Sequence, residues 1–212
     1  MSIHLLHKDS LDFPPTSQTD ATGILAIGGD LSSERLKKAY QQGIFPWYNE
    51  DEPIMWWCPD PRFVLFPQDL KVSKSMRKIL RDKVFTVVYN QDFESVMRNC
   101  GVISRVGQNG TWINEEMIEA YTQLHKEGLA LSVEVWQENE LVGGLYGIDL
   151  GNIFCGESMF SKVSNASKAG FITLVQEKLQ NYKLIDCQVY TEHLESLGAI
   201  EIDREIFLEF LR

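Results

Sequence analysis

The sequence predicts an α+β protein in which a small N-terminal α/β domain precedes a larger domain built around an antiparallel meander. Residues 24–42 combine a short apolar run, a glycine turn and a helical period, which is typical of a strand followed by a helix. Residues 130–160 contain three strand-like runs separated by Glu-Asn and Gly-Asn pairs, which favour tight turns between antiparallel strands. A helical period over 167–179 and an apolar run over 184–189 follow. Strands and helices are thus grouped along the chain, which favours α+β over a regularly alternating fold.

Composition indicates a soluble globular protein. The chain has 212 residues, of which 44% are hydrophobic and 24% charged, and these fractions exclude disordered, collagenous and membrane-spanning chains. A chain of this length buries about 70% of its unfolded surface, so neither disulfides nor metals are required for stability. Because the N-terminus lacks the pattern of a signal peptide and no apolar run is long enough to span a bilayer, we expect a cytoplasmic protein with no membrane partner.

The cysteines and histidines predict free thiols and no metal site. The four cysteines are widely spaced and form no CxxC pair, which suits a reducing compartment. They are Cys58, Cys100, Cys155 and Cys187. We interpret Cys155 and Cys187 as buried residues of strands, with a catalytic thiol as the alternative. No HExxH motif or Cys/His cluster has the spacing of metal ligands, and we expect no cofactor.

The predicted N-terminal domain covers residues 1–62 and the C-terminal domain 63–212. After an irregular start, an apolar run leads to a Gly-Gly-Asp turn, and Ser32 or Ser33 can cap a helix that ends before Gly43. The Gly-Gly pair does not match the phosphate-binding patterns GxGxxG or GxxxxGK[ST], so we assign it to turn geometry.

Residues 44–67 are rich in tryptophan and proline and are expected to form a rigid loop. Proline at this density forbids a continuous helix. Trp47, Trp56 and Trp57 lie in this segment, and two interpretations remain open for them. Rigid aromatic side chains can stack on a nucleobase or wall an apolar pocket, or they can simply fill the core.

Charge is unevenly distributed along the chain. Twenty basic and thirty acidic residues give a net charge of −10, which should repel nucleic acid overall. The segment 71–83 is the exception, with six basic residues against Asp82 alone, so it carries +5 and the other residues carry −15. Helical spacing places four of its cations in one stripe, namely Lys74, Arg77, Lys78 and Arg81. This stripe predicts either a nucleic-acid contact or an ordinary solvated helix face.

The remaining elements complete the prediction. We expect a strand over 85–89, a helix over 93–100, a glycine-rich segment up to residue 110, and a helix that Asn114 caps and Gly128 ends. The meander, helix and strand described above follow, and a short helix begins near Asp203. This order of elements is similar to the GNAT acyltransferase core, in which a splayed sheet opens a cleft for an acyl donor and an amine, although a fold alone does not fix a function.

Eight sequence motifs follow one another in order along the chain. They are GILAIGGDLS, AYQQGIFPWY, PIMWWCPDPR, GTWI with AYTQLH, LVGGLYG, FCGESMFSKVSNASK, LIDCQV and SLGAIEI. From about residue 13 to the end they closely resemble the bacterial leucyl/phenylalanyl-tRNA-protein transferases. The resemblance implies an enzyme without a cofactor that moves Leu, and also Phe or Met, from aminoacyl-tRNA to the α-amino group of proteins or peptides beginning with Arg or Lys, marking them for degradation. It also implies a GNAT-like C-terminal domain.

The motif LIDCQV carries the predicted catalytic pair. Asp186 and Gln188 are two residues apart, so on a regular strand both side chains point to the same face. The resemblance implies that Gln188 takes or guides the amine proton and that Asp186 polarises it. A neutral amide is a very weak base, so in the alternative Gln188 orients the amine while water or a tRNA hydroxyl carries the proton. A purely structural hydrogen-bonded pair at the strand end is the third interpretation.

Further site residues follow from the resemblance. Glu157 is a lone acid at an apolar strand end, where a charge is costly without a partner, and it is expected to hold the incoming ammonium or the aminoacyl amine as a third catalytic residue. A pocket for the aminoacyl side chain is expected from Leu145, Gly156 and Met159, where the thioether suits Leu, Phe and Met. Trp47 and Trp112 match tryptophans near the terminal adenosine of the tRNA, and the basic stripe is expected to meet phosphates of the acceptor stem.

Some positions depart from the family pattern. Leu131 stands where a histidine is frequent, Cys58 replaces a serine, and Leu145 is often Met in relatives, which alters the expected side-chain preference. Thr191 replaces an Asn that is expected near the reacting ester, so its role is not carried over. A CoA-dependent acetyltransferase is the rival enzyme, but SNASKAG lacks the spacing of its pyrophosphate loop. A non-catalytic tRNA or degradation-signal binding module is the rival outside catalysis.

Overall fold

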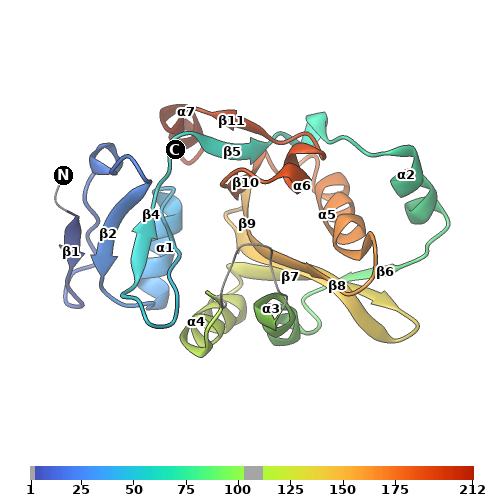
Figure 1. Ribbon diagram of the computed structural model, residues 1–212, viewed down its shortest axis with the longest axis horizontal. Coiled ribbons are helices and arrows are strands. Elements are labelled where there is room, and N and C mark those ends of the chain that lie inside the picture. The colour runs from blue at the N-terminus through green and yellow to red at the C-terminus, as the bar shows by residue number, and fades with distance from the viewer. Residues whose placement is uncertain (1–2, 103–111) are drawn as a thin grey trace.

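The computed structural model describes residues 3–102 and 112–212, so most of the predicted glycine-rich segment lies outside the described residues. The N-terminal part is a small four-stranded sheet in the order β1-β2-β4-β3 (Figure 1). Its strands are β1, His4–Leu6; β2, Ile24–Gly28; β3, Phe45–Pro46; and β4, Met55–Trp57. Helix α1, Ser33–Gln41, follows β2 and packs against β3 and against helix α4, Glu115–Lys126, of the larger part.

The C-terminal part is a seven-stranded sheet in the order β11-β5-β10-β9-β8-β7-β6. From β5 to β11 in chain order, its strands are Arg62–Leu65, Thr86–Tyr89, Ala130–Gln137, Glu140–Asp149, Ile153–Ser161, Leu184–Gln188 and Ile200–Ile202. Strands β7, β8 and β9 are the predicted meander, and alternate residues along them face opposite sides of the sheet. The prediction of three antiparallel strands is confirmed.

Helices cover both faces of the large sheet (Figure 1). Helices α3, Phe93–Val102, and α4, Glu115–Lys126, pack on one face, and α5, Ala166–Glu177, packs on the other beside α2, Lys74–Arg81. Helices α6, Glu192–Glu195, and α7, Arg204–Glu209, lie near the C-terminus, and short 3-10 turns cover Thr16–Gln18 and Pro67–Asp69. The side chain of Asn114 accepts a hydrogen bond from the backbone of Met117, so the predicted cap of α4 is confirmed.

The two strands at the centre of the sheet separate along their length. Parallel strands β9 and β10 pair only from Ile153 to Cys155, opposite Leu184 to Asp186, while β9 continues to Ser161 beside β8. Each strand carries an irregularity where they part. Glu157 is an extra residue between the pairs that Gly156 and Ser158 form with β8, and Cys187 is an extra residue opposite β5. The opening between the strands is the splay that a GNAT-like core requires.

One continuous hydrophobic cluster joins the two sheets. It contains Trp56 and Tyr40 of the N-terminal part together with Tyr121 and Phe160 of the C-terminal part, and all four side chains are buried. A second cluster lies between the large sheet and helix α5. The N-terminal part is therefore packed onto the large sheet and is not a loosely attached appendage.

The predicted α+β fold with a GNAT-like core is confirmed, and one segment differs from its prediction. Residues 44–67 contain strands β3, β4 and β5 where a loop was expected, because short extended segments can accept the fixed backbone angle of proline. The domain boundary after residue 62 stays a prediction; Arg62 itself is the first residue of β5 in the large sheet. Among the described residues, none of the helices is long and apolar enough to cross a membrane.

Candidate active site

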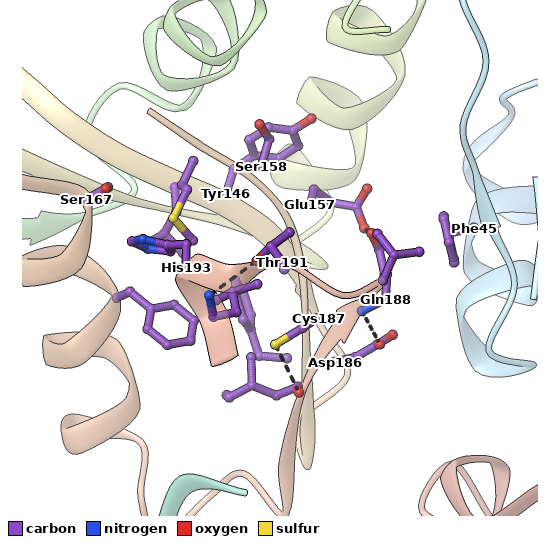
Figure 2. Close-up of a pocket in the computed structure, with 18 of the residues that line it drawn as sticks. Phe45, Tyr146, Glu157, Ser158, Ser167, Asp186, Cys187, Gln188, Thr191 and His193 are labelled. Atoms are coloured by element: carbon purple, nitrogen blue, oxygen red, sulfur yellow. Dashed lines mark hydrogen bonds between the residues drawn. The ribbon is translucent and has the colours of Figure 1, made fainter. Parts of the chain in front are cut away.

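A cavity of about 600 Å³ opens where β9 and β10 separate (Figure 2). Its walls come from β3, β8, β9, β10, α5 and the segment around α6. Eight of the residues predicted for the site line it, namely Trp47, Trp112, Leu145, Gly156, Glu157, Met159, Asp186 and Gln188. These residues are spread over more than half of the chain, and the fold brings them to one place.

One side of the cavity is apolar. Leu145 and Met159 are cross-strand neighbours on β8 and β9, and Phe171 of α5 lies in the same hydrophobic cluster. There is free space beside Gly156, because a Cβ atom at this position would meet only ordinary contacts with Asp186 and Phe154. The arrangement fits an apolar side chain and agrees with the pocket that the resemblance implied, while its ligand stays a prediction.

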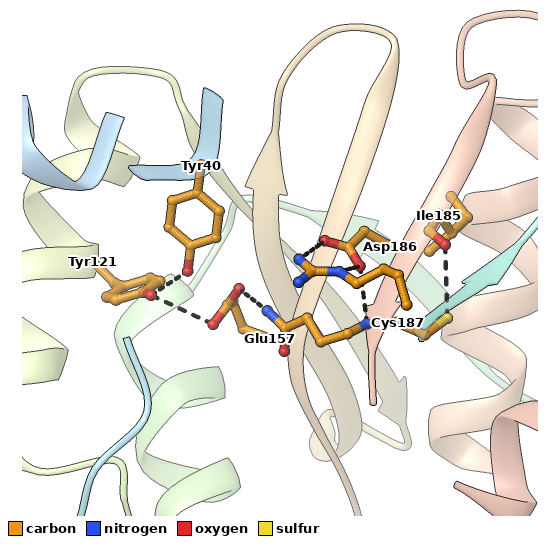
Figure 3. Close-up of polar contacts among 8 residues, drawn as sticks. Tyr40, Tyr121, Glu157, Ile185, Asp186 and Cys187 are labelled. Carbon is orange, nitrogen blue, oxygen red and sulfur yellow. Dashed lines mark hydrogen bonds and ion pairs between the residues drawn. The ribbon is translucent and has the colours of Figure 1, made fainter. Parts of the chain in front are cut away.

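Glu157 lies at the polar side of the cavity, and two side chains donate hydrogen bonds to it (Figure 3). Its Oε1 accepts from Nε2 of Gln188 at 2.8 Å, and its Oε2 accepts from the hydroxyl of Tyr121 at 3.4 Å. The hydroxyl of Tyr40 is in turn hydrogen-bonded to that of Tyr121. Burial raises the pKa of Glu157 to about 7, although the hydroxyl groups of Tyr40 and Tyr121 and the amide of Gln188 favour the ionised form. The carboxyl group can therefore gain or lose a proton near neutral pH.

Asp186 is wholly buried and already paired. Its carboxylate accepts two hydrogen bonds from Arg62, at 2.8 Å from Nε and at 2.6 Å from Nη2, and a third from the backbone of Gln188 at 2.9 Å. The guanidinium lies between the rings of Phe45 and Phe207, with its carbon 4.9 and 4.5 Å from their centroids. Paired in this way, the carboxylate is engaged by the protein itself.

The geometry at Gln188 differs from the regular strand that was expected. Its φ is +64°, in the left-handed region, and the strand register shifts between Asp186 and Gln188. The hydrogen bond from its backbone to Asp186 stabilises this bend, and the side chain then reaches across to Glu157 rather than sharing a target with Asp186. Alternation along a strand therefore does not describe this pair, since a bulge lies between the two residues.

The aromatic residues divide between the cavity and the core. Trp47 is half-buried and Trp112 is buried at the cavity wall, whereas Trp56 lies wholly in the core with its indole donating to the backbone of Gly28. Trp57 is half-buried against Trp47, with 5.3 Å between ring centroids. Both interpretations of the tryptophan segment thus apply, each to different residues.

The cysteines are structural. All four are free and buried, and Cys187 lines the cavity. Burial raises the pKa of both Cys155 and Cys187 well above the ordinary value, so each thiol stays protonated at neutral pH and is a poor nucleophile. Their interpretation as buried strand residues is confirmed, and the alternative of a catalytic thiol is not supported.

The basic stripe lies away from the cavity. Helix α2 carries Lys74, Arg77, Lys78 and Arg81 on its exposed face and buries Met76, so the predicted amphipathic helix is confirmed. It packs beside α5, and α5 in turn supplies a wall of the cavity. Its contact with nucleic acid stays a prediction.

The positions that depart from the family pattern have clear structural settings. Thr191 lines the cavity and caps α6, its hydroxyl oxygen accepting from the backbone of Leu194 at 3.2 Å. Leu131 is buried in the cluster under α5, and Cys58 is buried in the core of the N-terminal part.

Sequence reasoning missed Arg62, Tyr40, Tyr121 and His193. Arg62 follows Asp-Pro in the motif PDPR, and its ion-pair partner, Asp186, lies 124 positions further along the chain. Tyr40 and Tyr121 have the helical spacing of core residues, and nothing local signals a hydroxyl partner. His193 lines the cavity. The bulge at Glu157 is indicated by Gly147 and Gly156, glycines inside strands, whereas no glycine marks the bulge beside Gln188.

The splayed sheet and the cavity at its opening define a protein with a GNAT-like core. Comparisons with known proteins give the family. Residues 64–212 match the family model described as leucyl/phenylalanyl-tRNA protein transferase, and residues 29–60 match the N-terminal domain of that family. The chain belongs to the leucyl/phenylalanyl-tRNA protein transferase family and is a transferase enzyme.

Individual relatives agree with this assignment. A leucyl/phenylalanyl-tRNA–protein transferase of Flavobacterium johnsoniae is 65% identical over 211 residues, covering 99% of each chain. Its counterpart in Christiangramia forsetii is 60% identical over 202 residues, covering 94% of this chain and 95% of the relative. A crystal structure of a Bacteroides thetaiotaomicron protein of unknown function has a TM-score of 0.51 at 12% identity and covers 69% of this chain and 57% of that one; this similarity concerns the fold alone.

The buried ion pair yields a stability prediction. Replacing Arg62 by Ala leaves the Asp186 carboxylate buried without its partner, which should lower the free energy of unfolding by about 3 to 5 kcal/mol. Arg98 is the control, because it is also ion-paired, with Glu94 and Glu115, but is exposed, and Arg98→Ala should cost less than about 1 kcal/mol. Urea denaturation measures both values, and equal losses would contradict a special role for the buried pair.

Proposed function

We propose that this enzyme transfers Leu, Phe or Met from the 3′ end of an aminoacyl-tRNA to the α-amino group of a protein that begins with Arg or Lys, and that this transfer marks the protein for degradation. The observation that carries the proposal is a single cavity with an apolar side, two tryptophans at its wall and a hydrogen-bonded Glu157 and Gln188. The names of the relatives, which specify leucyl and phenylalanyl transfer, support the donor.

The apolar side of the cavity would receive the aminoacyl side chain. Leu145, Met159 and Phe171 can adapt to branched, linear or aromatic groups, because a thioether is flexible and polarisable. A hydrophobic pocket discriminates by only about 1 to 3 kcal/mol per methylene, so a preference among Leu, Phe and Met is expected rather than exclusive selection. The tryptophans Trp47 and Trp112 would stack on the terminal adenosine, which contributes about 1 to 3 kcal/mol per base.

The reaction requires little more than alignment and one proton acceptor. The donor is an activated ester, and the α-amino group has a pKa of about 8, so part of it is neutral at pH 7. Holding both reactants in a productive orientation is worth about 7 to 11 kcal/mol. The amine nitrogen attacks the ester carbonyl carbon, a C–N bond forms, and the carbonyl oxygen becomes an oxyanion.

Glu157 would accept the proton. The ionised carboxylate takes it from the attacking nitrogen and returns it to the ribose oxygen as the C–O bond breaks, which leaves a peptide bond and a deacylated tRNA. A carboxyl group with a pKa near 7 is well matched to both steps, whereas the neutral amide of Gln188 is a very weak base. Gln188 would orient the amine through its carbonyl oxygen while its Nε2 stays hydrogen-bonded to Glu157.

Asp186 would act as a positioning residue. Its oxygens are engaged by Arg62 and by the backbone of Gln188, so its contribution is to hold the bend that directs Gln188 into the cavity. This role differs from direct polarisation of the amine, and the occupied carboxylate is the observation that supports it. The acidic remainder of the chain, at −15, would attract a cationic N-terminus, and the basic face of α2 would meet tRNA phosphates.

Transfer itself is tested by incubating the protein with Leu-tRNA and an Arg-initiated peptide and then measuring the mass of the peptide. The expected result is a gain of one leucyl residue. A peptide that begins with Asp is the matched control and should stay unmodified. A second incubation with acetyl-CoA in place of Leu-tRNA examines the rival acetyltransferase, and acetylation there with no leucylation in the first would overturn the proposal.

The role of Glu157 predicts a pH dependence. The transfer rate should rise through pH 7 as Glu157 ionises, and Glu157→Gln should lose that step and retain only the rise near pH 8 from the amine. Because folding raises the pKa of this carboxyl above its unfolded value, ionisation destabilises the fold above about pH 4.5, so the variant should be no less stable at pH 8. A rise through pH 7 that persists in the variant would assign the proton to another group.

The basic face of α2 predicts a salt dependence. The double variant Lys74→Glu/Arg77→Glu should bind tRNA more weakly, and the slope of log affinity against log salt should fall by about 1 for each phosphate that the helix no longer binds. Lys8→Glu/Lys126→Glu changes the net charge equally at exposed positions outside α2 and serves as the control. Filter binding at several salt concentrations measures the slopes. Identical slopes for the two variants would show that α2 is an ordinary solvated helix face.

A further inference from the structure

A hydrogen-bonded chain runs from the N-terminal part of the protein into the cavity (Figure 3). It begins at Tyr40 of α1, continues through Tyr121 of α4 and ends at Glu157 of β9, whose other oxygen is bound to Gln188. Both tyrosines are almost wholly buried, at 2% and 0% exposure. Neither lines the cavity, so neither is placed to touch a substrate.

The contact between α1 and α4 holds this chain in place. Lys37 of α1 pairs with Glu127, which follows α4, at 2.7 Å, and Ser33 donates to the same carboxylate at 3.0 Å. Further along the two helices, the rings of Tyr40 and Tyr121 meet edge to face with 6.4 Å between centroids. The position of the Tyr121 hydroxyl therefore depends on how the N-terminal part is docked.

The two tyrosine hydroxyls can act as hydrogen-bond donors toward the Glu157 carboxylate. Tyrosine hydroxyls remain protonated here, because burial raises the pKa of both well above the ordinary value. Each hydroxyl therefore has one proton to donate and can also accept, which allows Tyr40 to donate to Tyr121 and Tyr121 to donate to Glu157. A hydrogen bond to an ionised group is stronger than one to a neutral group, so these donors favour the ionised form of Glu157.

We propose that Tyr40 and Tyr121 are positioning residues of the transfer reaction, in which a hydroxyl of the N-terminal domain orients a second hydroxyl that fixes the Glu157 carboxylate beside Gln188. This inference rests on the function proposed above and extends the reactive site to a part of the chain that supplies no catalytic residue. The N-terminal domain then has a role in the chemistry in addition to the stacking of the tRNA end on Trp47.

Other groups near Glu157 and its partners also contribute to the electrostatics of this site. They are Asp186 of β10, Arg62 of β5, Cys155 of β9 and Tyr146 of β8, in addition to Tyr40, Tyr121 and Gln188. Burial raises the pKa of Glu157 most, and the negative charge of Asp186 acts in the same direction. The tyrosine hydroxyls and the Gln188 amide act against both, so removing a hydroxyl should raise the pKa of Glu157 further.

The test replaces each hydroxyl without changing the ring. Tyr121→Phe should raise the midpoint near pH 7 of the transfer rate by about one pH unit, since loss of a hydrogen bond to a charged group has this magnitude. Tyr40→Phe removes the hydroxyl that orients Tyr121 and should shift the midpoint in the same direction. The rate at pH 7 should then fall about five-fold and recover near pH 9, with the KM for Leu-tRNA unchanged. An equal loss at every pH would assign the tyrosines a structural role only and overturn the proposal.

Tyr48→Phe is the matched control. Tyr48 is also a buried tyrosine of the N-terminal part, and its hydroxyl donates to Glu116 of α4 at 3.3 Å, but this contact does not lead to Glu157. This variant should leave the midpoint near pH 7 unchanged. A shift as large as that of Tyr40→Phe would mean that docking of the N-terminal part, and not the hydroxyl chain, governs Glu157.

A second measurement separates this inference from the proposed function. Titration of the glutamate side-chain carboxyl carbons by carbon-13 NMR, assigned with Glu157→Gln, follows Glu157 in the free protein without any substrate. The same upward shift is expected in Tyr40→Phe and Tyr121→Phe and not in Tyr48→Phe. An unchanged titration overturns the positioning chain, whereas a shifted titration in a protein that fails to leucylate the peptide overturns the proposed function instead.

Discussion

The buried pair of Arg62 and Asp186 fixes the point at which strands β9 and β10 part, and the cavity depends on that separation. The pair lies at the last residue of β10 that is registered with β9, and its guanidinium is held between two aromatic rings from opposite ends of the chain. A buried ion pair contributes little net stability, but loss of either partner is costly. The interaction therefore specifies one geometry of the opening more than it strengthens the fold.

The two carboxylates of the site, the buried Asp186 and the partly buried Glu157, have different partners. Asp186 faces a guanidinium and a backbone N–H, while the direct donors to Glu157 are the hydroxyl of Tyr121 and the amide of Gln188. Neutral donors offset less of the desolvation cost of a charge than a cation does, so burial keeps the pKa of Glu157 near 7. The proposed roles of these two acids, which are 29 positions apart in the sequence, are positioning for Asp186 and proton transfer for Glu157, and they rest on this difference in partners.

Basic and acidic residues are also separated from each other on the surface. A chain with a net charge of −10 presents four cations on the exposed face of α2, next to the helix that walls the cavity. In the proposed function, attraction to phosphate would be confined to this face, while the acidic remainder would repel nucleic acid approaching from other directions.

Much of the architecture was determined by the sequence itself. Turn pairs and hydrophobic periods located the meander, helix α5 and strand β10, because these signals are local and each acts within a few residues. The motifs likewise predicted eight residues that line the cavity. Tertiary structure alone decided what those residues do: the pairing of Asp186 with Arg62, the bend at Gln188 and the contact of Glu157 with Tyr121 all join distant segments. Desolvation and hydrogen bonding across such distances depend on packing, which local sequence patterns do not encode.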